Sequence, residues 1–269
     1  MAVDEIKKIL NSLIELPAMP NVVTRALSTI KDPNSGARDL AKVISNDHSI
    51  TVELLKMVNS PFYNLSQTIQ TVEQSIALLG FNEVKSIVIA CAMKPMMTSQ
   101  CGKDIWEHSI NTAVAAETIG KKLGRRDYDE LFAQGLMHDL GKMVFELYNS
   151  KKMTEAIMLA RGGADTLVAE KMVFGFDHTE VGNILGKRWE LPKQIISIMA
   201  NHHKPQASEF KTAACIIYLA NRIVQDPSPL VIVEPEVAPH LGFEITNIAG
   251  FRRQVLDKAR LLLRNLNSL

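Results

Sequence analysis

The spacing of apolar residues constrains the fold of this chain more than any other feature of its sequence. Apolar side chains recur every three or four positions, as Leu40, Val43 and Ile44 do in residues 38–45. This period places them on one face of an α-helix. The alternation of apolar and polar residues that is typical of strands is nearly absent. The sequence therefore predicts an all-α protein in which short loops join amphipathic helices.

Capping and turn residues predict where several helices begin and end. Thr71 and Gln74 form a capping-box pattern at the start of VEQSIALL. Gly80 suits the position that follows a helix. Asn82 is expected to cap the next helix, EVKSIVIACAM, and Pro95 is expected to close it.

The second half of the chain is also helical in pattern. Helices are expected over residues 104–123, 128–147, 153–160, 166–173, 179–189, 193–201, 211–224 and 248–266. Residues 225–239 contain four prolines and are interpreted as an irregular connector. A polar stretch at residues 98–102 is taken as a boundary. We therefore expect a two-lobed helical bundle with an N-terminal lobe over residues 1–100 and a second lobe over residues 101–269.

Composition and charge exclude several classes of protein. The 269 residues include 30 Lys+Arg and 29 Asp+Glu, and 46% are apolar, so the chain is neither disordered nor uniformly basic. The N-terminus, MAVDEIKKIL, is too charged for a signal peptide, and the longest nearly uncharged run, residues 86–93, is too short for a membrane span. The three cysteines are widely spaced and form no CxxC, which excludes a disulfide scaffold and a cysteine zinc site. A cytoplasmic protein is expected.

Five of the seven histidines form an ordered set in the second half. They are His108 in WEHSINTA, His138 with Asp139 in GLMHDLGK, His178 in GFDHTEVG, and His202 and His203 in MANHHKP. Imidazole and carboxylate groups suit divalent ions such as Zn, Fe and Mn. A single histidine in a helix is usually just packed or exposed. The ordered set H…HD…H…HH, in contrast, indicates a metal site.

The HD pair places a condition on the backbone. Adjacent residues on a helix diverge by about 100°. His138 and Asp139 can therefore share an ion only if the local backbone turns both inward. Gly141 suits such a tightly approached turn. Lys142 lies four residues after His138, on the same helical face, where its charge could neutralise a phosphate oxygen.

The histidine set resembles that of the HD superfamily of metal-dependent phosphohydrolases. More closely, the chain resembles the HDOD domain, a signalling output domain related to that superfamily. The motifs that carry this resemblance are LPAMP (16–20), DLAKVISND (39–47), LLKMVNSPFY (54–63), SIALLGFNEVKSIV (75–88), IWEHS, FAQGLMHDLGK, FGFDHTEVG, RWELP and HHKP. They extend from about residue 16 to residue 224. The resemblance implies a two-lobed helical fold with an HD-like second lobe, and a role in bacterial signal transduction.

The resemblance also implies a set of metal ligands. HD phosphohydrolases use a His, the HD pair and a later Asp, and His108, His138 and Asp139 match the first three. Asn221, in IIYLANRIV, stands where the later Asp is expected. An amide oxygen carries no charge, so we expect weaker metal binding or none.

The remaining histidines match an additional ligand set. His178, His202 and His203 match the further ligands of the cyclic-di-GMP phosphodiesterase branch, although the GYP signature of that branch is missing. Lys142 matches the lysine of its HD-x-GK motif. His48 replaces the usual Pro after Asp47 and is interpreted as structural. His240 has no matched role.

Two functions remain open at this stage. The first is a regulatory domain with a partly degenerate metal site, which would bind a signalling protein or a small phosphate-containing ligand. The alternative is an active phosphohydrolase on nucleotides or cyclic dinucleotides, with Fe, Mn, Zn or Mg as cofactor. In the alternative, Asp139 and Lys142 would be the catalytic residues.

The C-terminal helix raises a third and weaker possibility. Its basic residues, Arg252, Arg253, Lys258, Arg260 and Arg264, could contact nucleic acid or a membrane. Its apolar stripe of Phe251, Val255, Leu256, Ala259, Leu262, Leu263 and Leu266 instead predicts packing against the body or a second copy. We therefore expect neither a nucleic-acid partner nor a membrane.

Overall fold

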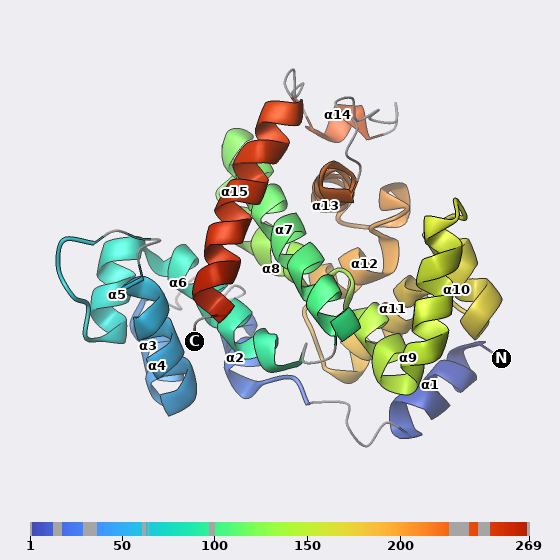
Figure 1. Ribbon diagram of the computed structural model, residues 1–269. Helices are drawn as coiled ribbons and strands as arrows, with labels where there is room; N and C mark the ends of the chain where they lie inside the picture. The colour runs from blue at the N-terminus through green and yellow to red at the C-terminus, as the bar shows by residue number, and fades with distance from the viewer. Residues whose placement is uncertain are drawn as a thin grey trace.

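The computed structural model describes residues 2–12, 18–28, 37–60, 63, 65–96, 100–225, 237–241 and 248–267. These residues form helices and no strand, so the expected all-α class is confirmed (Figure 1). None of the helices in these ranges is long and apolar enough to cross a membrane. The first residues of LPAMP and most of the proline-rich connector lie outside the described ranges.

The helices follow one another with short connections. The first half contains α1 (Ala2–Ser12), α2 (Asn21–Ser28), α3 (Ala37–Ser45), α4 (His48–Val58), α5 (Val72–Leu79), α6 (Phe81–Met93) and a 3-10 turn, η1 (Lys94–Met96). The second half contains α7 (Gln100–Lys122), α8 (Tyr128–Met137), α9 (Leu140–Arg161), α10 (Thr166–Phe174), α11 (His178–Arg188), α12 (Lys193–Asn201), the 3-10 turn η2 (Pro205–Ala207), α13 (Lys211–Gln225), α14 (Ala238–Leu241) and α15 (Ile248–Asn267).

Local capping explains the ends of α5 and α6. The Thr71 side chain accepts from the Gln74 backbone N–H and the Gln74 side chain accepts from Thr71, which confirms the capping box. The prediction that Asn82 caps the next helix is wrong, because α6 begins at Phe81 directly after Gly80. Gly80 has a φ of 89°, a conformation that favours glycine, and it is the single residue that links α5 to α6. Pro95 lies in η1, just beyond the end of α6.

The prediction of one continuous helix over residues 128–147 is wrong. The chain breaks at His138 and Asp139, which separate α8 from α9. Asp139 has φ −102° and ψ 12°, outside the helical region, so the two helices are not collinear. The separately expected helix over residues 153–160 lies in the second part of α9, and the non-helical Asn149 (φ −160°, ψ 91°) separates that part from the first, which confirms a distinct helical segment there.

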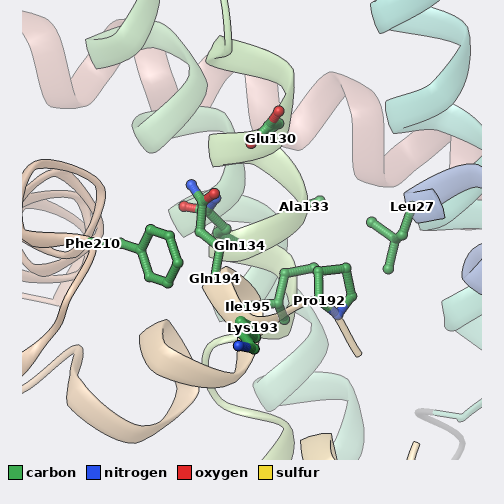
Figure 2. Close-up of a pocket in the computed structure, with 9 residues that line it drawn as sticks. All are labelled: Leu27, Glu130, Ala133, Gln134, Pro192, Lys193, Gln194, Ile195 and Phe210. Carbon is green, nitrogen blue, oxygen red and sulfur yellow. The ribbon is translucent and has the colours of Figure 1, made fainter. Parts of the chain in front are cut away.

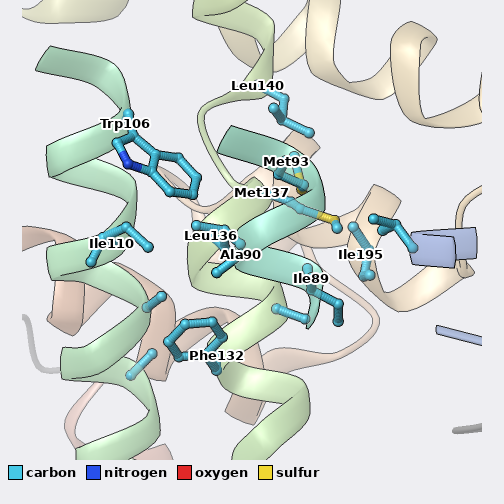
Figure 3. Packing of buried hydrophobic residues seen from close by; sticks show 14 of the residues in the cluster. Ile89, Ala90, Met93, Trp106, Ile110, Phe132, Leu136, Met137, Leu140 and Ile195 are labelled. Carbon is cyan, nitrogen blue, oxygen red and sulfur yellow. The ribbon is translucent and has the colours of Figure 1, made fainter. Parts of the chain in front are cut away.

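One core connects the two halves of the chain. Figure 3 shows α6, α7 and α8 packed together through Ile89, Ile110 and Phe132, all of which are buried. A buried ion pair between Lys85 and Asp129 joins α6 to α8. The chain's first helix packs on α11, where Arg188 donates to the side chain of Asn11 at 3.1 Å (Figure 1). Residues 97–99 of the predicted boundary lie outside the described ranges, and the division into two lobes stays a prediction.

The last helix, α15, packs along α7. The predicted apolar stripe is buried at Phe251, Val255, Ala259, Leu262, Leu263 and Leu266, and Leu256 is half-buried. Lys258 Nζ lies 2.8 Å from Glu117 Oε2 on α7, and Arg252 donates to the carbonyl oxygen of Ile223 at 2.6 Å. The stripe and two of the basic side chains therefore hold α15 against the body of the protein.

Candidate metal centre

Two glycines bring the histidine-bearing helices into close approach. A Cβ on Gly141 would lie 2.0 Å from the carbonyl oxygen of His178, so only glycine allows α9 to begin this close to α11. A Cβ on Gly135 would lie 2.7 Å from the Cα of Ala113, so α8 lies directly on α7. These contacts bring the HD pair next to His108 on α7 and next to the start of α11.

The break between α8 and α9 turns the HD pair into a single site. His138, Asp139 and His108 have donor atoms within 4.8 Å of one another, and we call this group the Asp139 triad. The Nε2 atoms of His108 and His138 are 3.3 Å apart. The condition that the HD pair placed on the backbone is thus met, because Asp139 lies in a non-helical turn rather than in a continuous helix.

A second group of donors lies beside the first. His178 at the start of α11 and His202 and His203 at the end of α12 also have donor atoms within 4.8 Å of one another, and we call them the histidine triad. The Nε2 atoms of His178 and His202 are 3.2 Å apart. The His203 ring centroid lies 4.4 Å from that of His202.

Asp139 lies between the two triads and faces both. Its Oδ2 atom is 3.5 Å from His108 Nε2 and 3.3 Å from His138 Nε2. Its Oδ1 atom is 3.2 Å from His178 Nε2 and 3.4 Å from His202 Nε2. One carboxylate therefore presents a separate oxygen to each group.

The other ring nitrogens of these histidines have partners of their own. His138 Nδ1 lies 2.7 Å from the carbonyl oxygen of Gly135, and His202 Nδ1 lies 3.2 Å from that of Ile198. A carbonyl oxygen can only accept, so Nδ1 carries the proton in each case. This leaves Nε2 of His138 and of His202 as the ring atoms that face Asp139, the orientation that a metal ligand requires.

Glu170 positions His178, and the sequence did not reveal it. Glu170 is buried on α10, and its Oε2 atom lies 2.7 Å from His178 Nδ1 and 2.8 Å from the His178 backbone nitrogen. No motif connects a glutamate with a histidine eight residues later. The contact arises because the turn at Gly175, whose φ is 87°, brings the start of α11 next to Glu170.

The charge states of the histidines differ because their surroundings differ. Burial lowers the pKa of His108 and of His202 to about 3. Burial acts in the same direction at His178, but the negative charges of Glu170 and Asp139 outweigh it and raise its pKa to about 9. Without a metal, His178 is thus charged at neutral pH, while His108 and His202 are neutral.

Asp139 is ionised despite its burial. Burial alone would raise its pKa, but the charges of His138, Lys142 and His178 hold it well below the usual value. Lys142 Nζ lies 2.6 Å from Asp139 Oδ2. Burial would lower the pKa of Lys142, but Asp139 and Glu170 keep it raised. The carboxylate and the ammonium group are thus charged partners.

A cleft gives access to the Asp139 triad. It has a volume of about 610 Å³, and its floor includes His108, Asp139 and Lys142. Apolar side chains of α9 form one wall, and Arg161 and Gln225 also line the cleft. Lys142 and Arg161 are the cationic side chains of this lining.

The other sequence-predicted residues lie in different places. Asn221 is buried on α13, one turn before Gln225 of the cleft, and its Oδ1 atom has no hydrogen-bond partner. His48 is exposed at the first position of α4, where Asp47 caps the helix. His240 belongs to α14, and its side chain lies outside the described residues.

Comparison with known protein families agrees with this architecture. The sequence profile of the HDOD domain matches residues 16–205. The chain belongs to the HDOD domain family. The match begins at the expected residue and includes the Asp139 triad, His178, His202 and His203, while Asn221 lies beyond its end. HDOD domains are related to HD phosphohydrolases, which accounts for the shared histidine pattern.

The curated relatives of this HDOD chain are distant. An uncharacterized protein of Treponema pallidum is 23% identical over 219 residues, which is 78% of this chain and 42% of that protein. The uncharacterized protein YuxH of Bacillus subtilis is 28% identical over 101 residues, which is 37% of this chain and 25% of that protein. The chain thus spans less than half the length of these relatives.

Solved structures share the fold. An HDOD domain protein of unknown function from Geobacter sulfurreducens has a TM-score of 0.75 at 21% identity, with 99% of this chain and 93% of that chain covered. A Shewanella amazonensis protein described as a candidate phosphohydrolase has a TM-score of 0.73 at 19% identity, with coverage of 96% and 97%. At these identities the likeness establishes the fold alone.

The donor set of this HDOD domain fits a divalent metal. Oδ1 of Asp139 and Nε2 of His203 are buried without a hydrogen-bond partner. His178 and His202 lie within ion-pair distance of that oxygen, but neither gives it a hydrogen bond of normal geometry. Buried polar atoms without partners are costly. A cation held between these imidazole nitrogens and carboxylate oxygens would satisfy them.

Proposed function

We propose that this HDOD domain is a bacterial regulatory module that binds divalent metal ions in both triads. Its output would be the binding of a signalling protein or of a small phosphate-containing ligand. The observation that supports this proposal is the position of Asp139, whose two oxygens face the two groups of histidines. A carboxylate between two sets of imidazoles is well suited to bridge two cations.

Each triad would hold one metal ion. His108, His138 and Asp139 would hold one ion, and His178, His202 and His203 would hold a second with the other oxygen of Asp139. Imidazole and carboxylate ligands suit Fe, Mn and Zn better than Mg, which prefers oxygen ligands. When bound, such ions polarise phosphoryl oxygens and lower the pKa of bound water. The Nδ1 contacts of His138, His178 and His202 hold these imidazole rings in the orientation that metal binding requires.

His178 must change its protonation state in order to bind metal. Its raised pKa means that Nε2 carries a proton in the metal-free protein. Glu170 accepts from Nδ1 and thereby keeps Nε2 directed toward Asp139 when that proton leaves. Glu170 is thus a positioning residue for His178.

The cleft gives the proposed phosphate ligand a place to bind. Lys142 lies in its floor, and Arg161 lines it as well. Both can donate hydrogen bonds to phosphate oxygens. Lys142 now donates to Asp139, and metal binding to that oxygen would free its ammonium group for a phosphate.

Asn221 favours regulation over catalysis. The family resemblance places an aspartate at this position, and the neutral amide removes one negative charge from the ligand set. With less negative charge, the site holds its ions less tightly and activates bound water less. A binding function tolerates this loss better than hydrolysis does.

Phosphohydrolysis is the second candidate function. The observation that favours it is the presence of His178, His202 and His203 next to an accessible cleft that contains Lys142. In this case Lys142 would stabilise the negative charge that develops on the phosphoryl oxygens. Nucleotides and cyclic dinucleotides would be the substrates to test.

Metal analysis and a hydrolysis assay separate these functions. The purified protein is stripped of metal, reloaded with Mn(II), Fe(II) or Zn(II), and analysed by elemental analysis and by hydrolysis of bis-p-nitrophenyl phosphate and cyclic dinucleotides. We expect two ions per chain and no turnover. His138→Ala should reduce the metal content, and the control His48→Ala should not, because His48 is exposed on α4.

Each result has a distinct meaning. Turnover that disappears in His138→Ala would replace the regulatory proposal with the enzymatic one. A folded protein that takes up none of the three metals would refute both metal-dependent functions. A content of two ions per chain that is unchanged in His138→Ala would place the metal elsewhere.

A further inference from the structure

A partly open cavity lies beside α8 and is lined by residues that belong to neither triad. It has a volume of about 270 Å³ and lies between α2, α8, the start of α12 and the segment before α13. Figure 2 shows Phe210 on one side, Leu27 on the other, and Pro192 and Ile195 below. Most of the lining is apolar, and Ala133 adds a small side chain that leaves space open.

One buried polar group in the lining lacks a partner. Gln134 is only 2% exposed, and its Oε1 atom has no hydrogen-bond partner. Figure 2 places the Gln134 side chain between Phe210 and Ala133, in the middle of the lining. A buried amide oxygen without a donor costs stability. The cavity therefore offers a hydrogen-bond acceptor to a molecule that brings an N–H or O–H group.

The charges that line the cavity are balanced. Glu130 and Lys193 contribute one acidic and one basic side chain. Burial, together with the nearby Asp129 and Asp127, raises the pKa of Glu130, so this carboxyl group disfavours further negative charge. A neutral occupant is therefore favoured over an anion, which distinguishes this cavity from the cleft above Asp139.

The volume limits the size of the occupant. An apolar cavity of about 150 Å³ is large enough to bind benzene. A cavity of about 270 Å³ thus has room for a larger molecule, about the size of a fused two-ring heterocycle. The ring of Phe210 offers an aromatic face, and such rings pack well against planar molecules.

We propose that this cavity binds a neutral, planar two-ring heterocycle whose N–H group donates to Gln134 Oε1. The proposal does not depend on a bound metal. The occupant would contact two helices that lead to the metal centre, because α8 is followed directly by His138 and α12 ends just before His202. A ligand here is thus suited to act as an input to the domain.

Indole and benzofuran test the proposal as a matched pair of probes. Each has nine non-hydrogen atoms in two fused rings, but only indole has an N–H donor. We expect indole to bind the metal-free protein with a Kd of about 0.1 mM, and benzofuran to bind roughly five-fold more weakly, for the loss of one hydrogen bond. Protein-detected NMR should show shifts at Ala133, Gln134 and Ile195.

Three variants locate the site. Ala133→Leu fills the cavity and should abolish indole binding, whereas Ala77→Leu makes the same change on the exposed face of α5 and should not. Gln134→Met keeps the volume and should remove the preference for indole over benzofuran. Circular dichroism checks that each variant folds.

Several results would overturn the proposal. They are the absence of indole binding up to 5 mM (about 50 times the expected Kd), equal affinity for the two probes in the wild type, and an unchanged preference in Gln134→Met. If Ala133→Leu fails to fold, the comparison of Gln134→Met with the wild type still tests whether Gln134 binds the N–H group of indole. The outcome is independent of whether the domain binds metal, since the measurement uses metal-free protein.

Discussion

The two triads differ in charge and in exposure, although they share Asp139. The Asp139 triad contains a carboxylate and faces a cleft, and the His108 side chain is 18% exposed. The histidine triad contains only imidazoles, and His178 and His202 are 0% exposed. In the proposed function, a metal in the first triad would contact a ligand in the cleft, whereas a metal in the second would be held mainly by buried imidazoles.

This difference indicates how the site depends on single residues. The Asp139 triad has its own anion, whereas the histidine triad depends on Asp139 Oδ1 and on the outer partner Glu170. Variants that remove one of these anions should therefore affect the triads to different extents.

Asp139→Asn should weaken both metal sites. The change removes the single negative charge that both triads share, so the loss should exceed the roughly 10- to 100-fold effect of removing an outer partner. Competition titration with a chromophoric chelator measures the two affinities. If one site keeps its affinity, Asp139 does not bridge the triads.

Glu170→Gln should weaken the histidine triad selectively. Gln still occupies the space but loses the charge that holds His178 in place, so affinity there should fall by about 10- to 100-fold while the Asp139 triad is nearly unchanged. The same titration reports both sites, and Glu155→Gln on the exposed face of α9 is the control. An equal loss at both sites would contradict the separate role of Glu170.

The pH dependence of the metal-free protein should reveal the difference between the triads. The pKa of His108 and of His202 is lowered to about 3, so their contribution to stability is present above pH 6.5 and is lost as the pH falls below it. Between pH 6.5 and pH 5 this amounts to roughly 2 kcal/mol for each histidine. The pKa of His178 is raised to about 9, so its contribution is complete below pH 6.5 and is lost as the pH rises through about 9.

Two measurements check these signs. Urea unfolding at several pH values gives the free energy of unfolding, and NMR of the imidazole protons gives each pKa. If His178 titrates near 6.5, Glu170 and Asp139 do not stabilise its charged form. If stability stays constant between pH 6.5 and pH 5, the two neutral histidines are not buried as described.

Asn221→Asp should tighten metal binding about ten-fold. The change restores the anion that the family resemblance places at this position, and one added charge is worth on the order of 1.4 kcal/mol in a partly solvated site. Metal titration measures the gain, and the hydrolysis assay shows whether turnover follows. Asn46→Asp, at an exposed position just after α3, is the control. If both variants raise the metal affinity equally, the gain comes from the net charge of the protein and not from a ligand at residue 221.

Occupation of the cavity at Gln134 should change the metal affinity by about five-fold. The two sites share α8 and α12, and couplings between sites usually lie between about 5- and 150-fold. The metal titration is repeated with saturating indole, and linkage requires that metal shifts the indole affinity by the same factor. An effect in only one direction would show that one of the measurements does not report binding.

The sequence alone predicted much of the helical fold and the residues of both triads. Apolar periodicity marks helices such as α12, whose predicted bounds agree with the structure, because the pattern depends on neighbours one turn apart. Apolar periodicity did not predict the break at Asp139, because residues 128–147 have continuous helical periodicity. The break is tied to the approach of Gly141 to His178, a contact between segments that are distant in sequence.

Other features were decided by the tertiary structure alone. The contact of Glu170 with His178 and the cavity around Gln134 depend on how helices pack, and no local spacing encodes them. The position of Asp139 between the triads likewise requires α7, α8, α9, α11 and α12 to meet. Local periodicity thus determined where the helices are, and the ordered histidine motif with its family resemblance determined which histidines to consider. Long-range packing decided which atoms face one another.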